Sequence, residues 1–399
     1  RQPNDEVLVD GKRIEAAFRK ARRLEFLGAD FVWEHIRWIG IEEPGAVQLL
    51  IAGGERQITA NGTDCGRAPS FTLLRQRLTP TPPAGPELPE VVRRLRRAAV
   101  EPETVRTYRN GWLFIDRDNA ADDSAEFMYR YVSTLRPDLN AFFILQRTSP
   151  HWRRMEREGA RLIAFAEDAH ALALLNADHL VSSHASHFVL DHLPRRYFGD
   201  MLKYRFTYLR HGVSKDINDW LNAAEIDCLI SSAPAEYQAI SGDGSEYRYC
   251  EREVALTGLA RHDMLLERAG APDDKVIVLM PTWRRSLTGM ALGPGNRRST
   301  ADAFYHSEFA RRWKALLHSP RLAAMARRHA HTVVFFLHDN LEQYRQHFEA
   351  PAHVAVRTFG DGGPVQPLFA GLSLFVTDYS SKAFDVALLR RRILYYQFD

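Results

Sequence analysis

The feature that most constrains this chain is a regular alternation of short apolar runs with segments of helical periodicity, which begins at Gly111. This alternation predicts a parallel sheet with helices on both faces, because parallel strands need crossover connections. The expected strands are Trp112–Asp116, Ala141–Gln146, Arg161–Phe165, His179–Ser182 and Phe206–Arg210, and the expected helices are Ser124–Leu135, Trp152–Glu158 and His170–Asn176.

A second series of the same kind starts near Asp274. Its helical region Phe309–Arg328 is interrupted by Pro320, and Ser380–Leu389 is a second expected helix. The expected strands are Lys275–Met280, Thr332–Leu337, Val354–Arg357, Leu372–Val376 and Ile393–Gln397. We therefore predict an α/β protein with two facing Rossmann-like domains, at 108–270 and 271–399. Ligands of such sheets bind beyond the carboxyl ends of the strands.

The residues before this region form a different kind of unit. Residues 1–78 are predicted to be a small mixed α/β unit, with strands at Val7–Asp10 and Val47–Ala52 and a helix at Lys12–Leu27. Residues 79–107 combine the Pro-rich linker Thr79–Pro86 with a basic helix, Val91–Ala99. Its four arginines are interpreted either as a solvated face or as a contact for an anionic membrane or polymer.

Composition excludes several classes of protein. The 399 residues carry 53 basic and 50 acidic side chains, a net charge of +3, so we expect no nucleic-acid partner. Cys65, Cys228 and Cys250 are far apart, which indicates neither a disulfide framework nor a zinc site. No apolar run approaches the about 20 residues of a membrane span, so we expect a cytoplasmic protein that can contact a membrane peripherally.

Two predicted strand ends carry candidates for acid–base chemistry. The segment Leu209–Asp216 places His211 directly after a strand, and Gly212 allows a tight turn beside the imidazole. A histidine in this position can act as a general base near neutral pH. The alternative is a capped turn with a surface histidine. His338 follows another strand, and alone this signal is weak.

Two further segments have features of phosphate sites. Val278–Arg285 delivers Thr282, Trp283 and the two arginines Arg284 and Arg285 to the rim of the second sheet, and arginine offers paired donors to phosphate. Ser380 and Ser381 open a helix, whose start favours anions. The alternatives are a core tryptophan with solvated arginines and an ordinary serine N-cap.

In order along the chain, these segments resemble the CDP-glycerol glycerophosphotransferase family of teichoic-acid and capsule polymerases. The resemblance covers residues 108–399. It rests on His211-Gly212 with Lys215, Gly258–Asp263, Pro281–Arg284, His338, and Thr377–Ser381 with Phe384-Asp385.

The resemblance implies a GT-B fold without an obligatory metal or other cofactor. An acceptor hydroxyl would attack the β-phosphorus of a CDP-polyol, with glycerol as the default polyol and ribitol as the alternative, and CMP would leave. His211 would be the base and His338 a second catalytic residue. Donor contacts are expected at Gly212, Lys215, Arg284, Thr377, Asp378, Ser380 and Ser381. His184 and Asp216 are candidates for contact with the acceptor, with a structural role as the alternative for His184.

The resemblance also implies partners and a location. The acceptor would be a polyol-phosphate or glycan end, lipid-linked as in the family, at the inner face of the bacterial membrane. The chain departs from the family pattern at Val213–Asp216 and at Asp339, where the family has Thr-Pro-Leu-Lys and proline. Family members continue beyond the equivalent of Asp399, so we expect the second domain to be truncated.

Three other functions remain open on sequence alone. A GT-B nucleotide-sugar glycosyltransferase would share the two facing domains but attack an anomeric carbon. An acyltransferase would use the His-x-x-x-x-Asp spacing of His211 and Asp216, which is short and frequent by chance. A non-catalytic module that binds polymer or a partner through the first 100 residues is the third.

Overall fold

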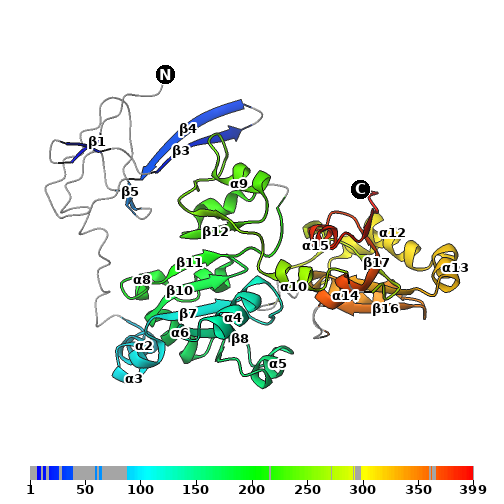
Figure 1. The fold of residues 1–399 in the computed structure, drawn as a ribbon, viewed down its shortest axis with the longest axis horizontal. Helices are drawn as coiled ribbons and strands as arrows, with labels where there is room; N and C mark the ends of the chain where they lie inside the picture. Colours follow the sequence, from blue (N-terminus) through cyan, green and yellow to red (C-terminus); the bar gives the residue numbers. More distant parts are fainter. Residues whose placement is uncertain are drawn as a thin grey trace.

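The structure is a computed structural model that describes residues 7–9, 12–14, 18–26, 29–38, 59–60, 63–64, 88–214, 217–270, 272–290, 292, 298–358, 361 and 365–398. Most of these residues form two α/β lobes that lie side by side (Figure 1). The two parallel sheets with helices on both faces confirm the predicted GT-B class with two Rossmann-like domains.

The N lobe is built on seven parallel strands in the order β13-β12-β11-β10-β7-β8-β9. The strands are β7 (Gly111–Ile115), β8 (Asn140–Leu145), β9 (Leu162–Ala164), β10 (Ala177–Ser182), β11 (Arg205–Tyr208), β12 (Cys228–Ser231) and β13 (Val254–Leu256). The helices are α2 (Glu90–Ala99), α3 (Pro102–Tyr108), α4 (Ser124–Leu135), α5 (Trp152–Arg157), α6 (Asp168–Asn176), α7 (His187–Leu190), α8 (Arg195–Phe198), α9 (Pro234–Ser241) and α10 (Arg261–Glu267), with a 3-10 turn η2 (Asp219–Ala223).

The C lobe is built on five parallel strands in the order β16-β15-β14-β17-β18. These are β14 (Val276–Met280), β15 (Thr332–Leu337), β16 (Val354–Thr358), β17 (Leu372–Thr377) and β18 (Arg392–Tyr395). Its helices are α11 (Asp302–His306), α12 (Glu308–Leu317), α13 (Pro320–Arg328), α14 (Gln366–Gly371) and α15 (Lys382–Leu388), with 3-10 segments η3 (Arg285–Leu287) and η4 (Asp339–Phe348).

Both sheets are buried on both faces, which explains their continuous apolar strands. In β7, Leu113 and Ile115 pack into one core cluster and Phe114 into another on the opposite face. In β15, Phe335 and Phe336 divide in the same way between two clusters. A strand whose side chains alternate between two cores has no polar face, so it is read from the sequence as an apolar run.

The predicted helical region Phe309–Arg328 divides as expected at Pro320. Pro320 is the first residue of α13, where a missing N–H costs no hydrogen bond, and the Ser319 hydroxyl accepts from the N–H of Leu322 at 3.4 Å. Helix α12 therefore ends at Leu317 and α13 starts a new direction (Figure 1).

The predicted helix Lys12–Leu27 is wrong. Within the described residues this region contains β2 (Lys12–Ile14) and β3 (Phe18–Phe26), and β3 pairs antiparallel with β4 (Ala29–Trp38). The apolar spacing fits a helix, but pairing between β3 and β4 decides the conformation.

Other strands described before Leu88 are β1 (Val7–Val9), β5 (Thr59–Ala60) and β6 (Thr63–Asp64), and β1 confirms the strand predicted there. The predicted strand Val47–Ala52 and the linker Thr79–Pro86 lie outside the described residues.

The arginines of α2 are paired with carboxylates. Arg93 pairs with Glu90, Arg94 with Asp168, and Arg96 with Asp200 at 2.6 Å. Helix α2 packs on α6 through Val92 and Leu95, so it is part of the N lobe. These pairs favour the interpretation as a solvated, charge-balanced face. None of the helices in the described ranges is both long and apolar enough to cross a bilayer.

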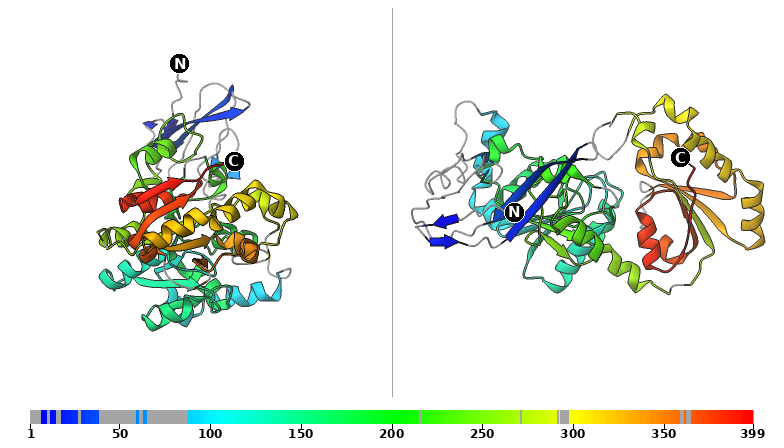
Figure 2. Two further views of the ribbon diagram at one scale, coloured as in Figure 1. Left: turned by 90° about the vertical axis from the view of Figure 1, so that its right-hand side faces the viewer. Right: turned by 90° about the horizontal axis from the view of Figure 1, so that it is seen from above.

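Helix α10 lies between the lobes and contacts both. It packs on α14 and α15 of the C lobe and on α4 of the N lobe (Figures 1 and 2). The predicted boundary at residue 270 falls between α10 and β14, so it places α10 in the first domain, although most of its partners belong to the second.

Candidate active site at the junction of the lobes

The loop after β11 is held in a defined shape by one glutamate. Arg210 has a left-handed backbone with φ of 64° and is 3% exposed. Its guanidinium pairs at 3.0 Å with Glu236 of α9, whose carboxylate also accepts the N–H of Ser214 at 3.1 Å. Glu236 thus binds residues before and after His211 in the chain, so the loop that carries the imidazole has a defined shape after β11.

His211 is oriented by its neighbours as a neutral base. Its ring stacks on that of His184 with centroids 4.3 Å apart and an angle of 11°. The carbonyl of Ser183 can only accept, so Nδ1 of His211, 3.3 Å away, carries the proton and Nε2 keeps its lone pair. The His211 side chain is exposed to solvent. Many protein atoms nevertheless lie near its ring, because the two lobes meet here.

The pKa of His211 is lowered to about 4. Burial is the main cause; Asp123 opposes it, whereas Arg117, Arg261 and Lys382 add to it. The pKa of His338 is lowered to about 3 by burial and by Arg117, His211 and Lys382. Both imidazoles are therefore neutral at pH 7 and share a positive electrostatic environment, which suits an anionic ligand.

Gly212 brings the two lobes into direct contact. A Cβ atom at this position would lie 2.8 Å from the hydroxyl oxygen of Ser381 at the start of α15. The glycine thus leaves room for the serine, and any side chain would force Ser381 or the loop to move. The predicted base and the predicted serine turn, 170 residues apart in the chain, are neighbours in the structure.

The serine turn presents hydroxyls beside a lysine. The N–H of Lys382 donates to the Ser380 hydroxyl at 3.2 Å, and both serines are half-buried. The Lys382 ammonium lies 3.3 Å from Asp385. Helix α15 has only seven residues, so the positive charge of this turn comes mainly from side chains rather than from a helix dipole.

Thr377 and Asp378 do not fit the predicted contact with phosphate. Both side chains are fully buried. The Thr377 hydroxyl donates to the carbonyl of Met280 at 2.7 Å, and the Asp378 carboxylate accepts the N–H of Thr282 at 2.8 Å. Asp378 also pairs with Arg284 at 3.1 Å, so its part is to position this arginine.

Arg284 lies where the loop after β14 meets the turn after β17. Besides its pair with Asp378, it donates to the carbonyl of Thr282 at 2.9 Å and lies over the Tyr379 ring at 5.0 Å. The guanidinium is therefore held in one orientation on the C lobe. Trp283 lies half-buried beside His338, with ring centroids 6.0 Å apart.

His338 and Asp339 join the C lobe to the N lobe through an arginine. His338 accepts the N–H of Asn340 on Nδ1 at 3.1 Å, which leaves the proton on Nε2. Asp339 pairs with Arg117 of the N lobe at 3.0 Å, and Arg117 also donates to His184 at 3.3 Å. The departure from the family pattern at Asp339 therefore supplies a cross-lobe contact.

A network of ion pairs next to this site was not predicted from the sequence. Arg261 of α10 is 1% exposed and binds Asp123 at 2.8 Å and Asp385 at 3.0 Å. His262 also contacts Asp385, at 2.8 Å. The network connects the start of α4, helix α10 and helix α15, which belong to different parts of the chain.

The chain has relatives of known family. Residues 104–399 match the model of the family CDP-Glycerol:Poly(glycerophosphate) glycerophosphotransferase. This chain belongs to that family. It is 30% identical to the minor teichoic acid biosynthesis protein GgaB of Bacillus subtilis (strain 168) over 293 residues. The matched region covers 72% of this chain and 32% of GgaB. The chain thus spans about a third of the length of that relative.

The chain is also similar to solved structures. The wall teichoic acid polymerase TagF is 16% identical, with a TM-score of 0.47, over 76% of this chain and 75% of that one. Anabaena Alr3699/HepE, solved in complex with UDP-glucose, is 12% identical, with a TM-score of 0.37, over 71% of this chain and 79% of that one.

The structure brings together most of the predicted site residues of this family member. His184, His211, Gly212, His338 and Ser381 lie at the junction of the lobes, whereas Lys215 and Asp216 lie outside the described residues. Arg117 was missed, and Arg261 and Lys382 lie in or beside the quoted motifs but were not predicted as site residues. Arg117 follows the predicted strand Trp112–Asp116, so the rule that located His211 would have found it. Among the described residues, no group of three or more His, Cys, Asp or Glu could hold a metal ion.

Proposed function

We propose that this chain transfers a polyol phosphate from a CDP-polyol to a hydroxyl of a cell-surface polymer or its lipid-linked precursor and releases CMP. Family membership supports the reaction class. The observation that carries the proposal is the contact of Gly212 with Ser381, because it brings a base from one lobe beside hydroxyls from the other. Glycerol phosphate is the default transferred group.

His211 acts as the general base in this mechanism. Its Nε2 accepts the proton of the acceptor hydroxyl, and the oxygen attacks the β-phosphorus of the donor. The bond between the β-phosphorus and the bridging oxygen breaks, and CMP leaves with the electron pair. The negative donor phosphates oppose the cations that lower the pKa of His211, so donor binding raises this pKa and makes Nε2 a stronger base.

The surrounding side chains stabilise charge. Ser380, Ser381 and the Nε2–H of neutral His338 donate to the donor phosphates, and Arg284 and Lys382 balance their charge. Phosphoryl transfer depends mainly on positioning and electrostatics, which such fixed donors supply. We expect turnover without an added metal or other cofactor, and CMP release that persists in EDTA would agree with this.

The test is product analysis with purified protein. CDP-glycerol, CDP-ribitol, UDP-glucose and GDP-mannose are each incubated with acceptor, and CMP, UDP and GDP are separated. We expect CMP alone. Release of UDP or GDP with glycosyl transfer would replace this proposal by the alternative, a GT-B nucleotide-sugar glycosyltransferase.

His211→Ala tests the base. We expect kcat to fall by about 100-fold or more, as is typical for loss of a positioned base. His329→Ala is the matched control, because His329 is exposed at the end of α13. Unchanged turnover of the His211 variant would remove the assigned base.

We further propose that the acceptor is lipid-linked and reached at the inner face of the membrane. The family relation to a teichoic acid biosynthesis protein supports an acceptor of this class. Flotation with anionic vesicles in the presence and absence of acceptor lipid would test it.

A further inference from the structure

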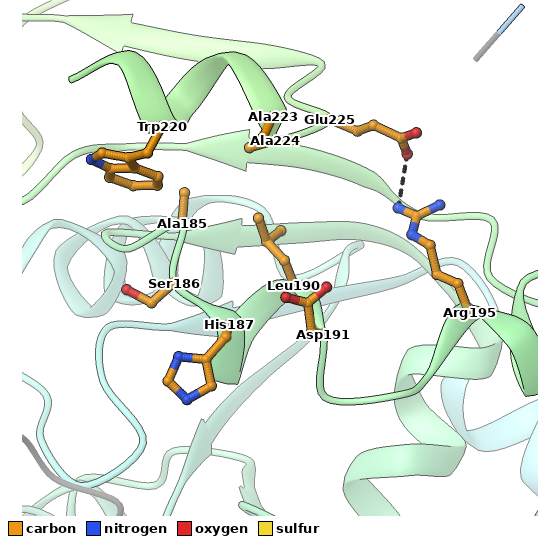
Figure 3. A pocket seen from close by; sticks show the side chains of 10 residues that line it. All are labelled: Ala185, Ser186, His187, Leu190, Asp191, Arg195, Trp220, Ala223, Ala224 and Glu225. Atoms are coloured by element: carbon orange, nitrogen blue, oxygen red, sulfur yellow. Dashed lines mark ion pairs between the residues drawn. The ribbon is translucent and has the colours of Figure 1, made fainter. Parts of the chain in front are cut away.

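A cavity of about 660 Å³ lies on the N lobe, beyond the carboxyl end of β10 (Figure 3). Its walls come from the loop after β10, from α7 and the start of α8, and from η2 with the residues after it. The lining residues are Ala185, Ser186, His187, Leu190, Asp191, Arg195, Trp220, Ala223, Ala224 and Glu225. No residue with an assigned part in the chemistry lines it.

We propose that this cavity binds a neutral glycosyl unit of the acceptor, next to the hydroxyl that is attacked. The inference rests on the proposed function, since it assigns the acceptor side of the same site. It commits to a sugar ring as occupant, in preference to a polyol-phosphate chain.

The position of the cavity supports an acceptor subsite. Ala185 directly follows His184, so their Cα atoms are about 3.8 Å apart. The His184 ring stacks on the ring of His211 at 4.3 Å. The cavity therefore lies one residue along the chain from a ring that stacks on the proposed base, on the N-lobe side of the junction.

The chemistry of the lining suits a sugar ring. Trp220 is 48% exposed, and its indole lies over one end of the cavity (Figure 3). The C–H face of a pyranose can cover this apolar surface, while its hydroxyls point to polar groups. Leu190 with Ala185, Ala223 and Ala224 adds an apolar wall. The volume lies in the usual range for small-ligand sites.

The charges of the cavity decide between the two acceptor classes. Asp191 and Glu225 contribute two carboxylates, and Arg195 contributes one guanidinium, which already pairs with Glu225 at 2.8 Å. Carboxylates accept hydrogen bonds from sugar hydroxyls but repel phosphodiesters. A polyanionic polyol-phosphate chain would therefore bind here less well than a neutral ring.

Trp220→Ala tests the stacking surface. Saturation-transfer NMR titrations use methyl N-acetyl-β-glucosaminide as the neutral probe and a glycerol phosphate trimer as the anionic one. We expect the wild type to bind the neutral probe and the variant to lose at least about 10-fold in affinity. CDP-glycerol affinity should stay unchanged. Tyr131→Ala is the control, because Tyr131 is 59% exposed on α4 outside the cavity.

A second variant tests the charge argument. Asp191→Asn keeps the shape of the cavity and removes one carboxylate. We expect it to improve binding of the glycerol phosphate trimer and to leave Trp220-dependent binding of the neutral probe within about 3-fold of wild type. Tighter binding of the trimer than of the neutral probe to the wild type, with loss in Trp220→Ala, would overturn the proposal.

The outcomes separate this inference from the proposed function. If the wild type binds the neutral probe through Trp220 but releases no CMP from any CDP-polyol, the subsite stands and the reaction is wrong. If the wild type releases CMP but Trp220→Ala binds the neutral probe as the wild type does, the reaction stands and the subsite is wrong.

Discussion

Two buried cations hold different parts of this chain together, and they do so with opposite chemistry. Arg261 is 1% exposed and binds the carboxylates of Asp123 and Asp385, which joins the N lobe to the C lobe. Lys20 of β3 is also 1% exposed, but it donates to the carbonyls of Ile240 and Gly242 and to the Ser245 hydroxyl, which holds the β3–β4 hairpin on the N lobe.

The difference lies in whether carboxylates pair directly with the buried cation. Burial by itself would lower the pKa of Arg261, but the two carboxylates outweigh it and raise this pKa. For Lys20 burial dominates over the attraction of Asp243, and the pKa falls to about 8. The lobes are thus joined by a permanent charge, whereas the hairpin is held by a group that can lose its proton.

The largest expected effect comes from removing Arg261. Arg261→Met removes the guanidinium that joins Asp123 to the buried Asp385 and leaves Asp385 with Lys382 as its only cation, so we expect the free energy of unfolding to fall by about 3–5 kcal/mol. The lobes should also lose their fixed orientation, and CMP release should fall with them. Urea denaturation and activity measure the two effects.

Neutralising the whole network sharpens this result. Arg261→Met combined with Asp123→Asn and Asp385→Asn removes the guanidinium together with both of its carboxylates, and only the partly exposed Lys382 loses a partner, so about half or more of the lost stability should return. Arg268→Met, at the end of the same helix, is the control. A triple variant no more stable than the single one would show that unpaired charge is not the cause.

Removing Lys20 should have a smaller and local effect. Lys20→Met deletes three hydrogen bonds from a charged donor, so we expect protection of the hairpin amides from hydrogen exchange to fall by about 10- to 100-fold, while the lobes stay unchanged. Arg19→Met is the control, because Arg19 is exposed on the same strand. Equal losses in both variants would mean that Lys20 has no special part.

The smallest effect is a dependence on pH. The pKa of Lys20 is about 8 in the docked hairpin, against an ordinary value of 10.5. Between these values the undocked hairpin binds more protons, so docking strengthens as the pH rises from about 8 to 10.5. Hydrogen exchange at pH 7.5, 8.5 and 9.5, corrected for intrinsic rates, should show rising protection, and Lys20→Met should abolish the slope.

The Arg261 network should show no slope in this range. The pKa of Asp385 lies below its ordinary 3.8, mainly because Arg261 and Lys382 outweigh burial, so its contribution to stability is lost only as the pH falls below that value. A slope of lobe stability between pH 8 and 10.5 that Arg261→Met removes would contradict the comparison.

The sequence by itself determined the α/β lobes and much of the site. Strand and helix periods are local, so β15 (Thr332–Leu337) and α4 (Ser124–Leu135) were predicted with their observed bounds. The rule that ligands lie beyond strand ends needs only the order of elements, and it led to His211 and His338. The helix predicted at Lys12–Leu27 was wrong, because its apolar spacing fits a helix and the pairing of β3 with β4 is not encoded in one segment.

Only the tertiary structure decided which residues meet. Arg261 lies 138 residues from Asp123 and 124 residues from Asp385, and no local pattern marks such partners. Burial likewise decided the different parts of neighbouring residues. Asp378 is fully buried and positions Arg284, whereas Ser380 and Ser381 remain accessible. The physical reason is that desolvation and ion pairing depend on what packs around a group, and distant segments supply those neighbours.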